Sequence, residues 1–181
     1  MTARGARSNH KILRPEPDDH ALGRSRGGLS TKTHLSVDRR GRPLSIRLTA
    51  GQAGDNPQLL PLLGEIAVPA RGRGGRPRGR PECVNADKAY SHRSTRITLR
   101  DKRIRVVIPE KSNQVAHRKA KGSAGGRPPT FDANTYRDRN VVERAFNRLK
   151  SWRGIATRYD KHARNYRAGL VVASIVLFWL R

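Results

Sequence analysis

Two short stretches of alternating apolar and polar residues, separated by a turn-forming sequence, constrain the fold more than any other feature of this chain. They cover residues 31–37 and 44–48, and each places an apolar side chain or a threonine at every second position. Such alternation is typical of a strand with one buried face, and residues 38–41 have turn chemistry. The pattern predicts an antiparallel hairpin with one face in the core. His34 falls on the polar face, so we expect a surface residue without a functional role.

A strand–helix–strand unit is predicted in the middle of the chain. Residues 83–86 and 105–108 are short apolar runs that indicate strands, and a helix is expected at about residues 92–100, with Ser91 as its N-cap. This order favours a parallel crossover. Ahead of the unit, we expect a helix with Asp55 as its N-cap.

Two helices are predicted at the carboxyl end. The first begins near Asp132 and continues to about Trp152. The second covers about residues 163–180 and is mostly apolar, so we expect it to be buried against the sheet. Residues 70–81 and 110–130 are rich in glycine, proline and basic residues, which favours loops.

The charge of the chain indicates its partner. The 181 residues include 39 Lys and Arg against 14 Asp and Glu, a formal net charge of +25. Such an excess favours a polyanion, above all nucleic acid. The longest apolar run, residues 168–180, is shorter than the roughly 20 residues that span a bilayer. One cysteine, Cys83, excludes an internal disulfide and a cysteine zinc site. We therefore expect a cytoplasmic, nucleoid-associated protein without a membrane partner.

The first 28 residues are interpreted as a basic, irregular amino-terminal arm. Residues 23–28 hold Arg24 and Arg26 among glycines and serine without a regular period, which indicates a loop. Two interpretations stay open for the arm. It is either disordered, or a DNA-binding loop in which Arg24 and Arg26 contact phosphates.

Five residues form the candidate chemical site. Tyr136, Arg139, Glu143 and Lys150 fall within roughly a 60° sector of one helical face. Asp87 follows a predicted parallel strand, at the edge where open α/β sheets place their sites. The alternative is an ordinary solvated helix face and a capping aspartate. Apolar residues cluster on the opposite side of the helix, at Val142, Ala145, Phe146 and Leu149.

These segments resemble the Asp-Asp-Glu transposases of bacterial insertion sequences. The run Asn-Ala-Asp-Lys-Ala-Tyr at residues 85–90, followed by Tyr136-x2-Arg139-x3-Glu143-x6-Lys150, matches the superfamily that includes insertion sequences four and five. The likeness covers nearly the whole chain. Five further stretches resemble the insertion-sequence-five group, at residues 20–29, 41–44, 125–129, 139–144 and 152–161.

The resemblance implies an α/β, ribonuclease-H-like fold, a mixed sheet flanked by helices, with residues 29–181 as a partial transposase catalytic domain. It implies that Asp87 and Glu143 are catalytic and bind Mg²⁺ or Mn²⁺, since hard cations prefer carboxylate oxygens. It also implies that Tyr136, Arg139 and Lys150 contact the backbone of double-stranded DNA or order the active site. Two divalent ions would activate the attacking oxygen and stabilise the leaving one.

The same resemblance places the family's first acid and first strand upstream of Thr2. The chain would then be a carboxyl-terminal fragment that is inactive alone, completed by an upstream transposase fragment or acting as a homo-oligomer. Two alternatives stay open. A non-enzymatic DNA-binding protein that acts through charge would show steep salt dependence, and a decayed remnant would lack a cooperative melt.

Overall fold

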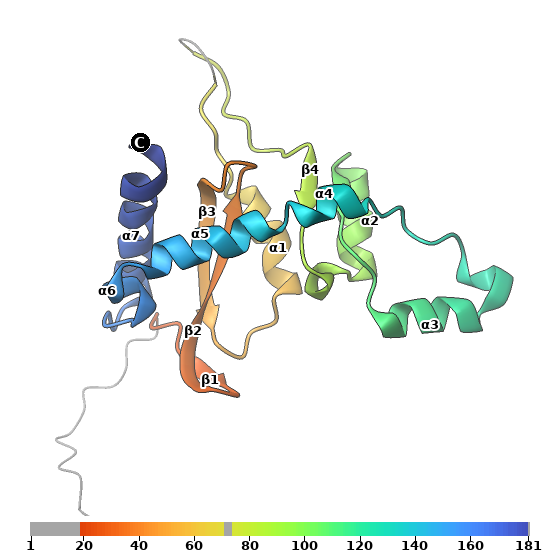
Figure 1. Cartoon of the computed structure of the whole chain (residues 1–181), viewed down its shortest axis with the longest axis horizontal. Coiled ribbons are helices and arrows are strands. Elements are labelled where there is room, and N and C mark those ends of the chain that lie inside the picture. Colours follow the sequence, from red (N-terminus) through yellow and green to blue (C-terminus); the bar gives the residue numbers. More distant parts are fainter. Residues whose placement is uncertain (1–18, 71–73, 181) are drawn as a thin grey trace, which may run out of the picture.

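The computed structural model describes residues 19–70 and 74–180, which fold into two small sheets and the helices that connect and cover them (Figure 1). The first sheet is antiparallel in the order β1-β2-β3. Its main part is the predicted hairpin of β2 (Gly28–Val37) and β3 (Pro43–Ala50), with Leu35 opposite Ile46. The hairpin prediction is confirmed.

Strand β1 (Gly23–Ser25) corrects the expectation of a loop at residues 23–28. A two-residue turn folds this segment back, and Arg24 pairs with Leu29 at the start of β2. The Ser25 hydroxyl donates a hydrogen bond to the Gly28 carbonyl at 3.0 Å and closes the turn. A strand of three residues is too short to show alternation, so the sequence pattern missed it. Residues 1–18 of the proposed arm lie outside the described residues, and at residue 19 the arm already contacts the body, where the Ala163 N–H donates to the Asp19 carbonyl at 3.1 Å.

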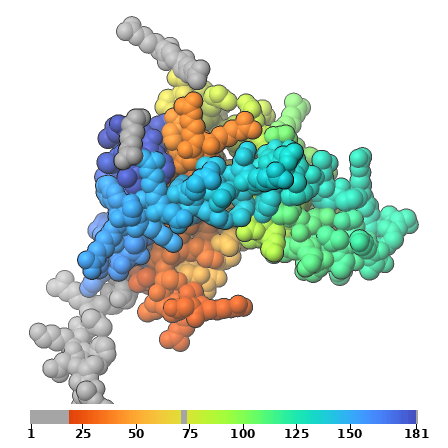
Figure 2. Space-filling view, in the orientation of Figure 1, coloured from red at the N-terminus to blue at the C-terminus, as the bar shows by residue number. Residues whose placement is uncertain are grey.

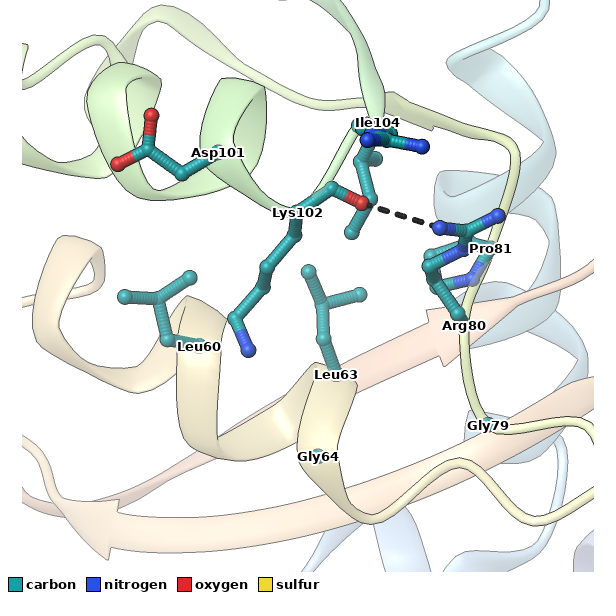
Figure 3. A pocket seen from close by; sticks show the side chains of 10 residues that line it. Leu60, Leu63, Gly64, Gly79, Arg80, Pro81, Asp101, Lys102 and Ile104 are labelled. Carbon is teal, nitrogen blue, oxygen red and sulfur yellow. Dashed lines mark hydrogen bonds between the residues drawn. The ribbon is translucent and has the colours of Figure 1, made fainter.

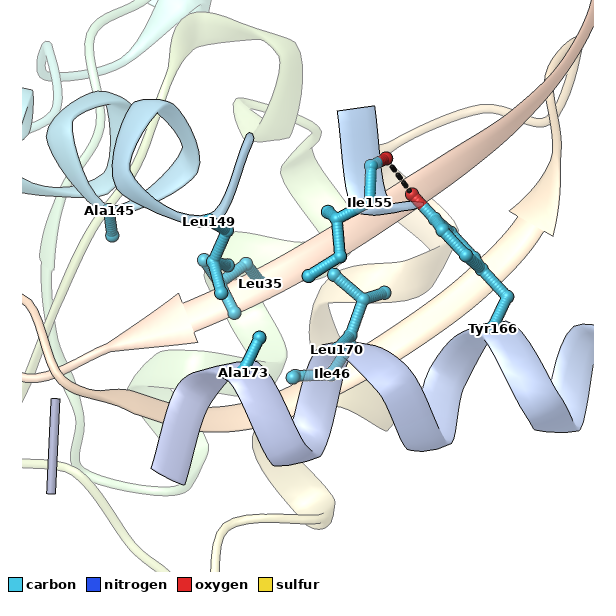
Figure 4. Close-up of a cluster of buried hydrophobic side chains, with 8 residues drawn as sticks. All are labelled: Leu35, Ile46, Ala145, Leu149, Ile155, Tyr166, Leu170 and Ala173. Atoms are coloured by element: carbon cyan, nitrogen blue, oxygen red, sulfur yellow. Dashed lines mark hydrogen bonds between the residues drawn. The ribbon is translucent and has the colours of Figure 1, made fainter. Parts of the chain in front are cut away.

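Helices cover both faces of the hairpin. Helices α5 (Asn140–Lys150) and α7 (Ala163–Ser174), with the short α6 (Arg153–Ala156), pack on one face. Figure 4 shows the resulting core, in which Leu35 and Ile46 meet side chains from all three helices. Leu149 and Ala173 are fully enclosed there. The Tyr166 hydroxyl donates to the Ile155 carbonyl at 2.9 Å and fixes α7 against α6 (Figure 4).

Helix α1 (Asn56–Gly64) covers the other face, which the alternation had marked as polar. The Ser45 hydroxyl donates to the Leu62 carbonyl at 2.8 Å, so the hairpin meets a helix here rather than water. His34 is therefore only 3% exposed, and its Nε2 lies 2.8 Å from Oγ1 of Thr49. The expectation of a surface histidine is wrong because α1 buries this face.

The second sheet is the predicted crossover. Strands β4 (Cys83–Asn85) and β5 (Arg105–Val107) are parallel, with Val84 opposite Val106, and α2 (Arg93–Asp101) connects them. The N-cap of α2 is His92 rather than Ser91, because the 3₁₀ turn η1 (Lys88–Tyr90) precedes it.

Helix α1 also joins the two sheets. A second core cluster unites Leu59 of α1 with Val84, Leu99 and Ile104 of the crossover unit. Within the described residues, β2 and β4 do not pair with each other, so the strands form two sheets and not the single mixed sheet expected. The architecture is mixed α/β, as predicted.

The carboxyl-terminal helices differ from the prediction in two ways. The expected helix from Asp132 to about Trp152 is divided into α4 (Ala133–Arg137) and α5. Helix α7 continues into a π-helical turn, η3 (Ile175–Trp179), and only one side of it is buried. The helix packs against the sheet as expected, through Leu170 and Ala173, but its outer side is open, and Val172 is 53% exposed.

The basic stretch at residues 110–130 is partly helical. It contains α3 (Ser112–Ala120) and the 3₁₀ turn η2 (Gly122–Gly125) in place of the expected loop. Gln114 holds α3 to the body by donating to the Ser91 carbonyl at 3.1 Å. Arg118 adds an ion pair with Glu110 at 2.8 Å. Among the described residues, no helix is both long and apolar enough to cross a membrane.

Candidate active site

The two candidate carboxylates line one cavity between the sheets. Asp87 lies two residues after the end of β4 in an extended conformation, and its carbonyl accepts a hydrogen bond from the Tyr90 N–H at 3.0 Å. Glu143 lies in the first turn of α5. Both line a cavity of about 290 Å³, which is also bordered by residues 33–37 of β2, by β4 and by Ala86. The fold thus brings together two acids that lie far apart in the sequence.

Arg139 bridges the two carboxylates. Its Nη1 lies 2.7 Å from Oε1 of Glu143 and 4.0 Å from Oδ2 of Asp87. Both acids are about half exposed, at 50% for Asp87 and 54% for Glu143, so these pairs contribute little to stability. The two ion pairs matter for geometry instead, because both carboxylates lie near the same guanidinium nitrogen.

The junction between α4 and α5 positions Arg139. Here the N–H of Arg139 donates to the Tyr136 carbonyl at 3.0 Å, a bond to the third residue back rather than the fourth. Such a tightened turn stacks residues three apart, and the Arg139 guanidinium lies 5.5 Å from the centre of the Tyr136 ring. In the space-filling view, α4 and α5 form a continuous band across the face of the molecule (Figure 2).

Asn85 fixes α4 to the end of β4. Its Nδ2 donates to the Thr135 carbonyl at 2.6 Å, one residue before Tyr136. Its Oδ1 is buried and has no hydrogen-bond partner among the described residues, although Asn85 lines the cavity. The sequence analysis gave Asn85 no role of its own. In the structure its amide ties α4, which carries Tyr136, to the end of β4.

Two further cavity residues were missed by the sequence analysis. Tyr90 lies beside Asp87, and burial first, then the charges of Asp55 and Asp87, raise the pKa of its phenol to about 12. It therefore stays protonated at neutral pH. His34 borders the same cavity. Tyr90 could have been found from the sequence, because it lies only three residues after Asp87. His34 could not, because its burial depends on α1.

The other predicted site residues lie apart from the acid pair. Lys150 is exposed at the end of α5 and does not border the acid cavity. It shares with Glu143 a separate cavity of about 570 Å³ beside Thr31. Arg24 lies on β1 and Arg26 in the turn that follows, away from β4 (Figure 1).

A different cavity, of about 440 Å³, lies between α1 and α2 (Figure 3). Leu60 and Leu63 line it, and Arg80 donates to the Lys102 carbonyl across its rim at 3.4 Å. Asp101 is the only acid that lines it, so this cavity offers no pair of carboxylates. The paired carboxylates of Asp87 and Glu143 therefore remain the better candidate.

The donor set of the acid pair suits a hard divalent cation in kind, since carboxylate oxygens are the preferred ligands of Mg²⁺. The number of donors, however, is small. Among residues 19–70 and 74–180, no group of three or more His, Cys, Asp or Glu side chains is placed to hold one ion. Asp87 and Glu143 are thus two ligands that fit such an ion and need further donors.

Comparison with known proteins defines the class. A family model described as a transposase DDE domain matches residues 10–178. A protein named as a transposase for insertion sequence element IS402, from Burkholderia cepacia, is 32% identical over 166 residues, which cover 92% of this chain and 70% of that protein. A second, named as a transposase for insertion sequence element IS6501, from Brucella ovis, is 31% identical over 153 residues, 84% of this chain and all of that protein. No solved structure matches.

The molecule is therefore a relative of the transposases of bacterial insertion sequences, as the motifs of its sequence indicated. It belongs to the transposase DDE domain family.

Proposed function

We propose that this chain acts in DNA transposition, and that Asp87 and Glu143 are catalytic carboxylates that bind Mg²⁺ or Mn²⁺ at a phosphodiester of double-stranded DNA. The observation that supports this most is their convergence on Arg139 in one cavity, from a strand end and a helix. When bound, divalent ions supply an activated attacking oxygen and stabilise the leaving one.

The side chains around the pair have distinct roles in this proposal. Arg139 orients both acids, and the ring of Tyr136 packs against its guanidinium. The protonated Tyr90 donates a hydrogen bond into the cavity. Lys150, on the same helix as Glu143, contacts a DNA phosphate as a point charge.

The third carboxylate comes from a segment outside the described residues, and an upstream transposase fragment is the expected partner. Strand β2 over residues 31–37 pairs only with β3, and β4 pairs only with β5, within the described residues. Both therefore present an unpaired edge, and both border the acid cavity. Unpaired strand edges are ready templates for a further strand. A strand between them would deliver a carboxylate next to Asp87.

Metal binding tests the acid pair without requiring activity. The purified chain is titrated with Mn²⁺, and bound ion is measured by electron paramagnetic resonance. We expect weak binding that Asp87→Asn or Glu143→Gln abolishes. Glu82→Gln is the matched control, because the Glu82 side chain is 91% exposed and does not line the cavity. Equal binding by the chain and by the Glu143→Gln variant would contradict the proposed ligand set.

DNA nicking tests the need for a third carboxylate. A supercoiled plasmid is incubated with Mg²⁺ and the chain, alone or co-expressed with an upstream transposase fragment. We expect nicking only by the combination, and its loss in Glu143→Gln. Nicking by the chain alone would show that the described acids suffice. No nicking in any combination, together with no Mn²⁺ binding, would leave a DNA-binding protein that acts through its charge.

A further inference from the structure

We propose that an arginine groove on the outer side of the crossover unit binds the phosphate backbone of DNA, separately from the acid pair. The groove has a volume of about 730 Å³ and is bordered by α2, β5 and the residues that lead into α4. This assignment rests on the proposed function only in taking DNA as the ligand. It does not require any chemistry at Asp87 or Glu143.

Helix α2 presents its arginines on one side because another side is buried. Leu99 is fully enclosed and Thr95 is 3% exposed, and both face the core. Arg93, Arg96 and Arg100 recur at offsets of three and four residues, so they share one side of the helix, next to the buried side. Arg105 of β5 and Arg127 complete the basic wall of the groove.

Almost no negative charge compensates this wall. Asp132 is the one acid that borders the groove, and its carboxylate already accepts the N–H groups of Asn134 and Thr135. None of the ion pairs formed within the described residues involves an arginine of the groove. These arginines are Arg93, Arg96, Arg100, Arg103, Arg105 and Arg127.

One of the six has a structural role. The Nη2 of Arg96 donates to the Ile108 carbonyl at 2.6 Å and ties α2 to the end of β5. Burial lowers the pKa of Arg96. The other five are exposed and keep their guanidinium groups free for a ligand. Guanidinium forks match phosphate oxygens bidentately, which favours a phosphodiester over other anions.

Arg103 adds a cation at the carboxyl end of α2. It follows the end of α2 with a φ of +55°, in the left-handed region that glycine occupies most easily. Its N–H donates to the Arg100 carbonyl at 2.8 Å and that of Ile104 donates to the Leu99 carbonyl at 2.9 Å, so this conformation ends the helix. An arginine here costs stability relative to glycine and places one more cation at the groove.

The length of the basic face fits a nucleic-acid strand. The seven helical steps from Arg93 to Arg100 extend about 10 Å. One strand of duplex DNA advances about 3.4 Å along the axis per nucleotide. The face therefore matches about three consecutive phosphates, and Arg105 lies beside them on β5.

Salt-dependent DNA binding tests the groove. Affinity for a 30-base-pair duplex is measured in EDTA at several salt concentrations, so that no reaction occurs. The groove variant carries Arg93→Gln, Arg100→Gln and Arg105→Gln. The control variant removes three exposed cations elsewhere, through Arg153→Gln, Lys161→Gln and Arg164→Gln. Thermal melts confirm that both variants are folded.

The expected result follows from counterion release, which contributes about 0.9 to the log–log salt slope per phosphate contact. The groove variant should lose about three units of slope, and the control less than one. Replacing the same three arginines by lysine should keep the slope and weaken binding, because the bidentate contacts are lost. Arg103→Gly should raise the melting temperature and weaken DNA binding.

Each contrary outcome has a separate meaning. Equal losses in the groove and control variants would refute the groove, while DNA binding by the chain would stand. No change in affinity on Arg103→Gly would remove this arginine from the site. No DNA binding by the unaltered chain would contradict the proposed function itself.

Discussion

The buried His34 predicts that the stability of this protein falls in mild acid. Its ring is enclosed by α1, and its Nδ1 lies 3.9 Å from Oδ1 of Asp55. Burial lowers the pKa of His34, Asp55 opposes the shift, and the cations Lys32 and Arg47 reinforce it. In the unfolded chain the imidazole regains its ordinary pKa of about 6.5. Below that pH, and down to the folded pKa, the unfolded state binds more protons, so the free energy of unfolding decreases as the pH falls.

The size of the effect follows from proton linkage. A single proton bound only by the unfolded state changes the free energy of unfolding by at most about 1.4 kcal/mol per pH unit. A domain of 150–250 residues changes its melting temperature by about 2–4 °C per kcal/mol. We therefore expect His34 to lower the melting temperature by up to about 3–6 °C for each pH unit below about 6.5.

Thermal melts of the whole chain between pH 7.5 and 5.0, followed by circular dichroism, measure this slope. His34→Gln keeps a hydrogen-bonding side chain for Thr49 and removes the titrating group, so its curve should be flatter. His117→Gln is the matched control, because His117 is exposed on α3, and its curve should match that of the unaltered chain. The reasoning is refuted if His34→Gln retains the full acid-induced decrease.

Three further substitutions test the core and one helix cap. Leu149→Ala should reduce the free energy of unfolding by about 2–5 kcal/mol in urea titrations, because Leu149 is fully enclosed in the core of Figure 4; a cost below about 1 kcal/mol would contradict that packing. Tyr166→Phe should cost about 1–3 kcal/mol by the same measurement, because it leaves the buried Ile155 carbonyl without its donor, and an unchanged value would exclude that bond. Asp132→Ala should lower the melting temperature at pH 7 by removing the N-cap of α4. Hydrogen bonds from Thr135 and Asn134 lower the pKa of Asp132, so this difference should shrink as the pH falls below about 4 and vanish only below the lowered pKa of the folded chain; a difference that does not shrink would point to another cause.

The local elements of the fold could be predicted because their signals are local. The hairpin follows from alternation over seven residues, and the crossover follows from two apolar runs around a helix. The burial of His34 could not be predicted in the same way, since its strand presents a polar face by pattern. That face is covered by α1, a helix that lies later in the chain and packs there through the Ser45–Leu62 contact.

The identity of the candidate site residues stays a prediction, and the structure agrees with only part of its expected geometry. The resemblance named Asp87, Arg139 and Glu143, and the structure brings these three together. Lys150 is on the same helix as Glu143 and still borders a different cavity. A regular helix from residue 132 to 152 was assumed, whereas the turn at Arg139 is tightened. Helical periodicity cannot anticipate such a turn, because Asn85 fixes α4 from a distant strand.

Arg139 also explains how two carboxylates remain turned toward each other in so basic a protein. Without a cation between them, two such groups repel and rotate apart into solvent. Here the guanidinium lies close to Glu143 and more loosely beside Asp87, and both acids keep about half of their surface exposed. Weak, solvent-screened pairs of this kind are easily exchanged. If a divalent ion binds the two carboxylates as proposed, it would replace Arg139 there at little cost and would free the guanidinium for a phosphate of the bound DNA. In that proposal the same side chain would hold the acid pair before the metal and the DNA arrive and would contact the DNA afterwards.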